Sequence, residues 1–206
     1  MIYWNEEAKM WWVDSELPRV YKWMVNHIDA IDYALQYMPR RGFCIQAGAY
    51  LGMWPAALSK HFQRVLCFEP IMELYECCLR NLELAKAANV VAYPQCLSGG
   101  VGGMRYMARK HGGRSTVQLP SDEPVQFEPV MGVVIDELEL PVVDALFLDV
   151  ERSELDVLKG AAQTIERDRP VIVLEVLTGQ EHYHEYMAKI GYRKVGRSHS
   201  DWVYVP

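Results

Sequence analysis

The chain has 206 residues, of which 50% are hydrophobic, 23% charged and 11% aromatic, and its formal net charge is -6 at pH 7. This composition excludes a mainly disordered or fibrous protein, and a chain of this length can bury roughly 70% of its unfolded surface in one domain. The excess of acidic residues argues against a surface built to collect phosphate backbones.

Cysteine usage and the N-terminus indicate an intracellular protein. The five cysteines are odd in number and no pair has zinc-ligand spacing, so we expect reduced, mostly buried thiols in a cytoplasmic protein. Glu6, Glu7 and Lys9 interrupt the aromatic N-terminus, which does not fit a signal peptide. Residues 87–104, one of the two longest uncharged stretches, contain a proline and four glycines, so we expect no membrane helix.

The hydrophobic pattern predicts helices and strands in alternation. In chain order, we expect a helix over 17–38, a strand over 43–47, a helix over 51–62, a strand over 65–68, a helix over 71–88, a strand over 90–93, short extended pieces around 104–108 and 125–135, a strand over 142–149, a helix over 153–167, a strand over 170–176, a helix over 180–190, and a hairpin of 192–195 and 202–205. This alternation predicts an α/β fold with a mostly parallel sheet covered by helices on both faces.

Two regions are expected along the chain. Residues 1–41 form an aromatic segment and a helix that pack on the core, and residues 42–206 form the main domain, with a Gly/Pro-rich insertion around 98–141. The aromatic residues of the N-terminus are either a lid or interaction surface, or a clasp packed on the domain; both interpretations stay open. They are Tyr3, Trp4, Trp11 and Trp12.

Ligands of such sheets bind at the carboxyl ends of the strands, so the residues after each strand are candidates. The first strand leads into Gly48-Ala49-Tyr50-Leu51-Gly52, where small residues let a ligand approach the backbone. Glu69 ends the second strand, where an acid can accept hydrogen bonds from both ribose hydroxyls. The alternatives are a glycine turn needed only for packing, and an acid that caps the helix from Ile71. The turn lacks the dinucleotide and P-loop patterns, so an adenosine without phosphates, S-adenosylmethionine, fits better.

The sequence resembles the FkbM-type methyltransferases of the class I S-adenosylmethionine-dependent superfamily, over roughly residues 42 to 205. The motifs that carry the resemblance are residues 46–52, Phe68-Glu69-Pro70, Leu97-Ser98, residues 134–138, residues 149–161 and residues 170–176. The most specific of these is the segment of residues 149–161. The resemblance implies a Rossmann-like seven-stranded sheet with a C-terminal antiparallel hairpin, and methyl transfer from S-adenosylmethionine, usually to a hydroxyl of a small molecule or sugar. The cofactor-binding residues that it implies are Gln46, Gly48, Ala49, Tyr50, Gly52, Glu69, Pro70, Cys96 and Leu97.

Acidic residues after the fourth strand are the candidates for work on the acceptor, because a base near a hydroxyl helps to remove its proton. We expect Asp149 and Glu151 in this role, with Asp136 as a further candidate, and we expect Glu154 to complement the dipole of the helix from Ser153. Carboxylates on adjacent strand ends could hold a divalent metal, but the sequence leads us to expect none.

Three departures from the family pattern leave a second interpretation open. Gln46 stands where the family usually has Asp, and Tyr50 stands where it often has Asn. Arg152 stands where the family has Gly after Asp-Val-Glu. A non-catalytic adenosine-binding or assembly module is therefore the alternative, and an NAD-dependent oxidoreductase ranks last. Nucleic acid is not expected as the acceptor, because Asp149-Val150-Glu151 replaces the Asn-Pro-Pro-aromatic motif of nucleic-acid amino methyltransferases.

Overall fold

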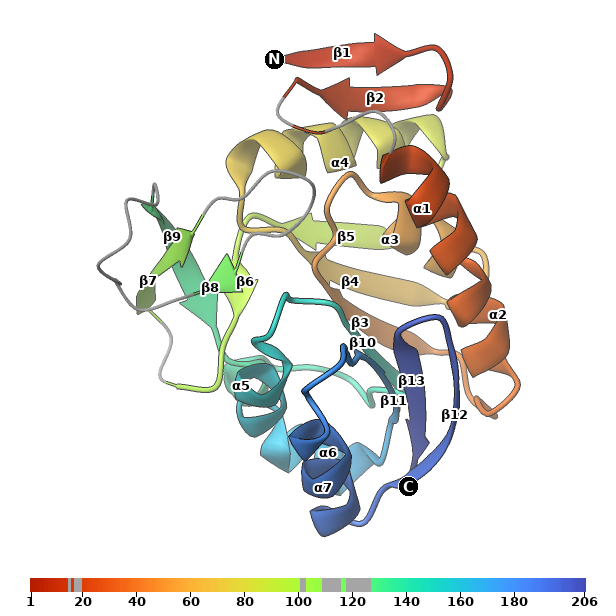
Figure 1. Ribbon diagram of the computed structural model, residues 1–206, viewed down its shortest axis with the longest axis vertical. Helices are drawn as coiled ribbons and strands as arrows, with labels where there is room; N and C mark the ends of the chain where they lie inside the picture. The colour runs from red at the N-terminus through yellow and green to blue at the C-terminus, as the bar shows by residue number, and fades with distance from the viewer. Residues whose placement is uncertain (15, 17–19, 101–102, 109–115, 118–126) are drawn as a thin grey trace.

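The structure is a computed structural model that describes residues 1–14, 16, 20–100, 103–108, 116–117 and 127–206 (Figure 1). Its centre is a seven-stranded sheet in the order β12-β13-β11-β10-β3-β4-β5. Only β13 runs antiparallel to its neighbours, so the α/β fold class and the C-terminal hairpin are confirmed. The strands are β3 (Phe43–Ala47), β4 (Arg64–Phe68), β5 (Val90–Tyr93), β10 (Ala145–Leu148), β11 (Val171–Glu175), β12 (Arg193–Ser198) and β13 (Asp201–Val205).

Helices cover both faces of this sheet (Figure 1). One face carries α2 (Asp29–Leu35), α3 (Met53–Leu58) and α4 (Met72–Leu84), and the other carries the 3-10 turn η1 (Ile135–Glu137), α5 (Glu154–Lys159), α6 (Ala162–Asp168) and α7 (His182–Lys189). Because both faces are covered, the central parallel strands are mostly apolar, and every residue of β3, β10 and β11 is buried, including Gln46 and Glu175.

Two predicted helices are divided in the structure. The helix expected over 17–38 becomes α1 (Val20–His27) and α2, and residues 17–19 lie outside the described part of the chain. The helix expected over 153–167 is interrupted between α5 and α6. A Cβ on Gly160 would lie 2.1 Å from the carbonyl oxygen of Ser98, so the start of the insertion packs directly on the break.

A second, four-stranded sheet lies beside the main one, at the left of Figure 1, in the order β6-β9-β7-β8. Its strands are β6 (Cys96–Leu97), β7 (Gly103–Ala108), β8 (Thr116–Val117) and β9 (Phe127–Val133). The sequence predicts short extended pieces here but not their pairing. Part of the predicted insertion, residues 101–102, 109–115 and 118–126, lies outside the described residues.

The aromatic N-terminus forms a hairpin that the sequence analysis did not predict. Its strands are β1 (Ile2–Asn5) and β2 (Met10–Val13), which pair in antiparallel register. Trp12 is fully buried, and Asn81 of α4 accepts a hydrogen bond from the backbone N–H of Trp11 at 2.7 Å and donates to its carbonyl at 3.0 Å. The same amide nitrogen donates to the carbonyl of Leu51 at 2.7 Å. Asn81 therefore joins the hairpin to the glycine turn after β3.

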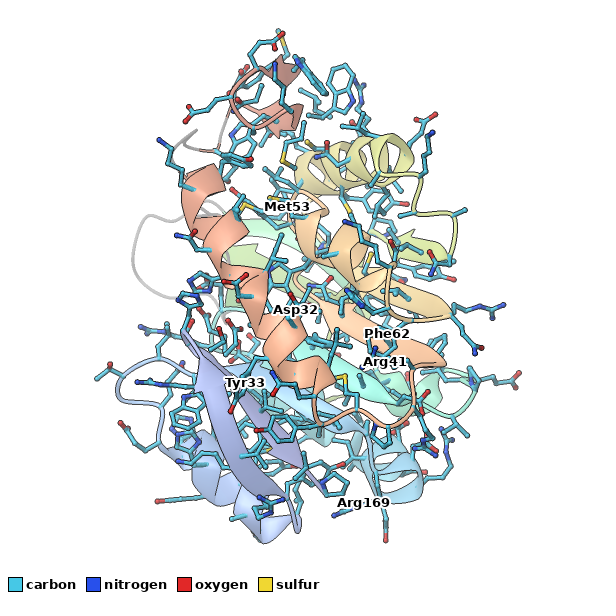
Figure 2. The ribbon with its side chains drawn as sticks, turned by 90° about the vertical axis from the view of Figure 1, so that its right-hand side faces the viewer. Asp32, Tyr33, Arg41, Met53, Phe62 and Arg169 are labelled. Carbon is cyan, nitrogen blue, oxygen red and sulfur yellow. The ribbon has the colours of Figure 1, made fainter. Side chains whose placement is uncertain are left out.

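Side chains pack tightly on the face that α2 and α3 cover, which Figure 2 shows from the front. Phe62 and Trp54 contact Phe147 of β10 edge-on, and Tyr33 lies against Gly196 of β12. All five cysteines are free and buried, as expected. No helix within the described ranges combines the length and apolar character needed to cross a bilayer.

Gly48 offers a test of how closely β3 and β10 approach. A Cβ there would lie 1.8 Å from the carbonyl oxygen of Asp149, and its φ is +81°. We expect Gly48→Ala to lower the free energy of unfolding by about 2–4 kcal/mol, from left-handed strain plus overlap. Gly179, at φ +87° with nothing within 4 Å, is the matched control. Gly179→Ala should cost about 1 kcal/mol from strain alone. Equal losses in urea denaturation would contradict a tight contact at Gly48.

Candidate cofactor and catalytic site

The turn between β3 and α3 is held in place by the neighbouring strand β4. The backbone N–H groups of Gly48 and Ala49 both donate to the carbonyl of Phe68, at 3.1 and 2.9 Å. Gly48, Tyr50 and Gly52 all have positive φ, at 81°, 50° and 90°. Tyr50 is the strained member, since a non-glycine residue rarely adopts this conformation. The predicted cofactor turn thus contains three left-handed residues and is hydrogen-bonded to the end of β4.

Glu69 contacts this turn directly. Its Oε2 accepts a hydrogen bond from the backbone N–H of Tyr50 at 2.8 Å, and its Oε1 accepts from Ile71 at 3.0 Å. The carboxylate therefore caps α4 and ties the turn together at once. Burial raises the pKa of Glu69 to about 7, although the two backbone donors oppose that shift. A carboxylate has about four acceptor positions, so two remain for other donors.

The other predicted cofactor residues lie around the same edge. Gln46 is buried in β3, where its Nε2 donates to the carbonyls of Ala47 and Gly48 at 3.1 and 2.9 Å. Its Oε1 has no hydrogen-bond partner among the described residues. Pro70 follows Glu69 directly. Cys96 and Leu97 are buried in β6, on the second sheet, and Cys96 shares an apolar cluster with residues of the turn and of α4.

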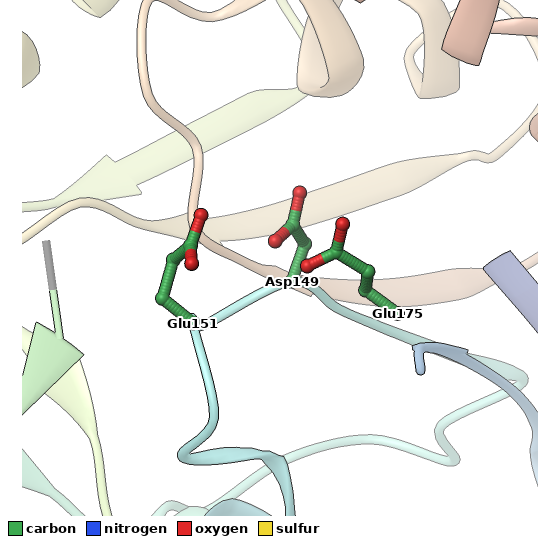
Figure 3. Close-up of side chains that lie close together, drawn as sticks. All are labelled: Asp149, Glu151 and Glu175. Atoms are coloured by element: carbon green, nitrogen blue, oxygen red, sulfur yellow. The ribbon is translucent and has the colours of Figure 1, made fainter. Parts of the chain in front are cut away.

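Three carboxyl groups gather at the carboxyl ends of β10 and β11 (Figure 3). One carboxylate oxygen from each of Asp149, Glu151 and Glu175 lies within 4.8 Å of the others. Burial and repulsion by the neighbouring acids raise the pKa of Asp149 well above its ordinary value, and the pKa of Glu175 is also raised, chiefly by burial. The two predicted acceptor-side acids, Asp149 and Glu151, are therefore side by side, with Glu175 as a third member.

The loop that carries Asp149 and Glu151 is strained, and the buried side chain of Glu154 holds it by hydrogen bonds. Glu151 and Arg152 have φ of 51° and 78°, which explains why a glycine suits the position after Asp-Val-Glu. The Oε1 of Glu154 accepts the backbone N–H groups of Val150 and Arg152 at 3.0 and 3.3 Å, and its Oε2 accepts the hydroxyl of Tyr183 at 2.8 Å. Glu154 is 1% exposed, so it organises the loop from inside, a role beyond the dipole effect expected for it.

Asp136 lies apart from these acids. Its Oδ2 and Oδ1 accept hydrogen bonds from the backbone N–H groups of Gln163 and Thr164, both at 2.9 Å. These donors belong to the first turn of α6, so the carboxylate of Asp136 caps that helix. Asp136 thus has a structural partner, and the described geometry does not bring it into the acidic cluster.

The sequence analysis missed an acid at the same edge, Asp201 at the start of β13. It pairs in register with Glu175, is 4% exposed, and lies 3.4 Å from Nδ1 of His27. Burial raises the pKa of Asp201, and His27 opposes that shift. An antiparallel strand begins where its parallel neighbour ends, so an acid at the first position of the last strand was the available signal.

Glu16 of the N-terminal region is a second residue that the sequence analysis missed. It is 6% exposed, and its Oε2 accepts a hydrogen bond from the hydroxyl of Tyr50 at 2.6 Å. Burial, together with the Glu16 carboxylate, raises the pKa of Tyr50, so the tyrosine hydroxyl keeps its proton. The N-terminal region therefore contacts the turn through Glu16 as well as through the Asn81 side chain of α4.

The pKa of Glu69 predicts how stability depends on pH. The folded protein holds this proton with a pKa of about 7, against an ordinary 4.5. The free energy of unfolding should therefore fall as pH rises through this interval, by on the order of 3 kcal/mol from this group. Glu69→Gln removes the titration, so its stability relative to the wild type should rise by that amount between about pH 5 and about pH 8. Urea denaturation at both pH values measures the difference. The exposed Glu83→Gln is the control, and parallel curves for Glu69→Gln and wild type would contradict the assignment.

Comparison with solved structures places the fold among methyltransferases. A methyltransferase FkbM from Methylobacillus flagellatus KT matches with a TM-score of 0.61 and 17% identity, over 81% of this chain and 44% of that chain. A SAM-dependent methyltransferase from Aquifex aeolicus matches with a TM-score of 0.52 and 13% identity, over 94% and 98%. A ribosomal protein L11 methylase from Lactobacillus delbrueckii subsp. bulgaricus gives 0.52 and 12%, over 100% and 79%. This protein thus spans less than half of the Methylobacillus chain, and at these identities the likeness shows the fold.

A comparison of sequences identifies the family. None of the curated proteins matches this chain. The methyltransferase FkbM domain matches residues 46–194, from Gln46 in β3 to Lys194 in β12. This range includes the glycine turn, Glu69 and the acids after β10 and β11. Because the match covers most of the chain, the protein belongs to the FkbM methyltransferase family.

Proposed function

We propose that this protein binds S-adenosylmethionine and transfers its methyl group to a hydroxyl of a small molecule or sugar. The observation that carries the proposal is the contact between Gly48 and the backbone of Asp149, because it brings the cofactor turn against the acidic loop. A methyl donor held by the turn would lie beside carboxylates that can receive a hydroxyl proton. Alignment of donor and acceptor is the main source of catalysis in such a transfer.

Two features of the chain fit this cofactor. Glu69 keeps two acceptor positions, which suit the two hydroxyls of a ribose. The acidic cluster beside the turn is the second feature. When bound, S-adenosylmethionine supplies a methyl group on a cationic sulfonium. The negative charge of the acidic cluster favours that cation.

Asp149 and Glu151 act on the acceptor in this proposal. The acceptor oxygen bonds to the methyl carbon as the carbon–sulfur bond breaks, its electron pair stays on sulfur, and the hydroxyl proton passes to a carboxylate oxygen. The raised pKa of Asp149 brings that carboxylate closer to the working pH of a general base. Carboxylates at this edge also disfavour a polyanionic acceptor, which supports a small molecule or sugar over a nucleic acid.

The alternative proposal is a non-catalytic adenosine-binding or assembly module that keeps the fold. It rests on Gln46, which lacks the charge of the usual Asp, and on Arg152 in a conformation that favours glycine. An adenosine-binding module would bind the cofactor without turnover, and an assembly module would show neither binding nor turnover. Measurements of binding and of methyl transfer therefore separate them.

Calorimetry with S-adenosylmethionine and S-adenosylhomocysteine tests cofactor binding. We expect the wild type to bind both, and Glu69→Ala to bind at least about tenfold more weakly, because two hydroxyl contacts of about 1 kcal/mol each would be lost. Glu83→Ala, an exposed acid of α4, should leave both affinities unchanged. Absence of binding to either ligand at millimolar concentration would refute the proposal.

Release of S-adenosylhomocysteine in the presence of a panel of hydroxylated small molecules and sugars tests catalysis. We expect Glu151→Gln to lower kcat by about 100-fold or more, the usual contribution of a general base, with little change in affinity for S-adenosylhomocysteine. Glu166→Gln, on the exposed side of α6, is the control. Full turnover by Glu151→Gln would show that Glu151 is not the general base. Binding without turnover on any acceptor would favour the non-catalytic alternative.

A further inference from the structure

Four polar side chains at the carboxyl edge of the sheet point to the same face. Side chains alternate between the two faces along a strand, so Asp149 lies on the face of Phe147, and Glu175 on the face of Val173. Gln46 is the register partner of Phe147, and Asp201 is the partner of Glu175. Gln46, Asp149, Glu175 and Asp201 therefore converge on the side that carries the apolar cluster beneath α2 and α3.

The spacing of the carboxylates suits a single ion. One oxygen each from Asp149, Glu151 and Glu175 lies within 4.8 Å of the others (Figure 3). Two oxygens bound to the same Mg²⁺ or Ca²⁺ lie about 3 to 5 Å apart, because each metal–oxygen bond is about 2.0 to 2.6 Å long. The three oxygens therefore need little movement to share one cation.

Gln46 is an independent indication that this edge binds a ligand. Its side chain is 2% exposed, and its Nε2 bonds to the carbonyls of Ala47 and Gly48, which turns the amide toward the carboxyl end of β3. Its Oε1 has no partner within the described chain, and Gln46 lines one small pocket together with Asp149 and Asp201. A buried carbonyl oxygen without a donor is costly, so it points to a ligand with hydrogen-bond donors in that pocket.

We propose that Asp149, Glu151 and Glu175 form a site for a divalent cation, with Gln46 accepting a hydrogen bond from a water on that cation. Carboxylate oxygens without nitrogen or sulfur favour hard ions such as Mg²⁺, Ca²⁺ or Mn²⁺. Three protein oxygens leave coordination positions for an acceptor hydroxyl. The role of the site rests on the proposed function: the cation binds the acceptor oxygen and lowers the pKa of its hydroxyl, whose proton passes to a carboxylate oxygen of the cluster.

Titration of the cofactor-free protein with MnCl₂, with free Mn²⁺ followed by electron paramagnetic resonance, tests the site. We expect about one Mn²⁺ per chain, displaced by Mg²⁺ or Ca²⁺, and at least about tenfold weaker binding in Asp149→Asn and Glu175→Gln. Asp32→Asn, an exposed acid of α2, is the control (Figure 2). Thermal denaturation checks that each variant is folded. No Mn²⁺ binding by the wild type at millimolar concentration, or equal binding by the folded variants, would overturn the proposal.

Gln46→Glu provides a test in the opposite direction. A carboxylate in place of the amide adds negative charge beside the three acids, so the affinity for Mn²⁺ should rise by about threefold or more. An affinity that is unchanged or reduced in this variant, with its fold intact, would show that Gln46 does not face the cation and would overturn the proposed arrangement.

Binding of S-adenosylhomocysteine to the same metal-free preparations separates this site from the proposed function. If the wild type binds S-adenosylhomocysteine but not Mn²⁺, the cation site is wrong and the methyltransferase proposal stands. If the wild type binds Mn²⁺, the variants bind it more weakly as expected, and S-adenosylhomocysteine does not bind, the cation site stands and the proposed function is wrong. If Asp149→Asn and Glu175→Gln weaken only S-adenosylhomocysteine, the carboxylates hold the α-ammonium group of the cofactor, which also overturns the cation site.

Discussion

The backbone of Gly48 lies against the carbonyl of Asp149, and the geometry of the whole edge depends on that contact. The strands β3 and β10 are adjacent although about a hundred residues separate them in the chain, so the turn after one and the loop after the other must share the same space. A Cβ at Gly48 would lie 1.8 Å from that oxygen. Glycine is therefore required here for closeness, and this closeness brings the cofactor turn and the acids into one site.

Buried carboxylates organise both loops of the site by accepting backbone hydrogen bonds. Glu69 holds Tyr50 and Ile71, and Glu154 holds Val150 and Arg152. Burying a charge is costly unless donors surround it, and here the donors are the N–H groups of turns that no strand or helix would satisfy. The left-handed residues in both loops are held by these contacts, so local strain is offset by charge-assisted hydrogen bonds.

Patterns within short stretches of the sequence predicted most of the fold and part of the site. Short apolar runs identified β3, β4, β10 and β11, because burial on both faces leaves a pattern that a short window of sequence contains. The edge strand β5, which has half-buried and exposed residues, was identified from its apolar composition. The acids Asp149 and Glu151 were predicted for the same reason, since they follow an apolar strand directly. The split at Gly160 and the hairpin of the N-terminus were missed, because the first depends on contact with Ser98 and the second on contact with Asn81.

The sequence by itself determined the α/β alternation, the family, the glycine turn and the position of acids at strand ends, because each of these is written in consecutive residues. The tertiary structure alone decided which of the acids meet. It bonded the carboxylate of Asp136 to the first turn of α6, brought Asp201 beside Glu175, and left Gln46 facing the same side as the cluster. The physical reason is that register and strand order, which arise from packing between distant segments, determine the distances between side chains at the edge of a sheet.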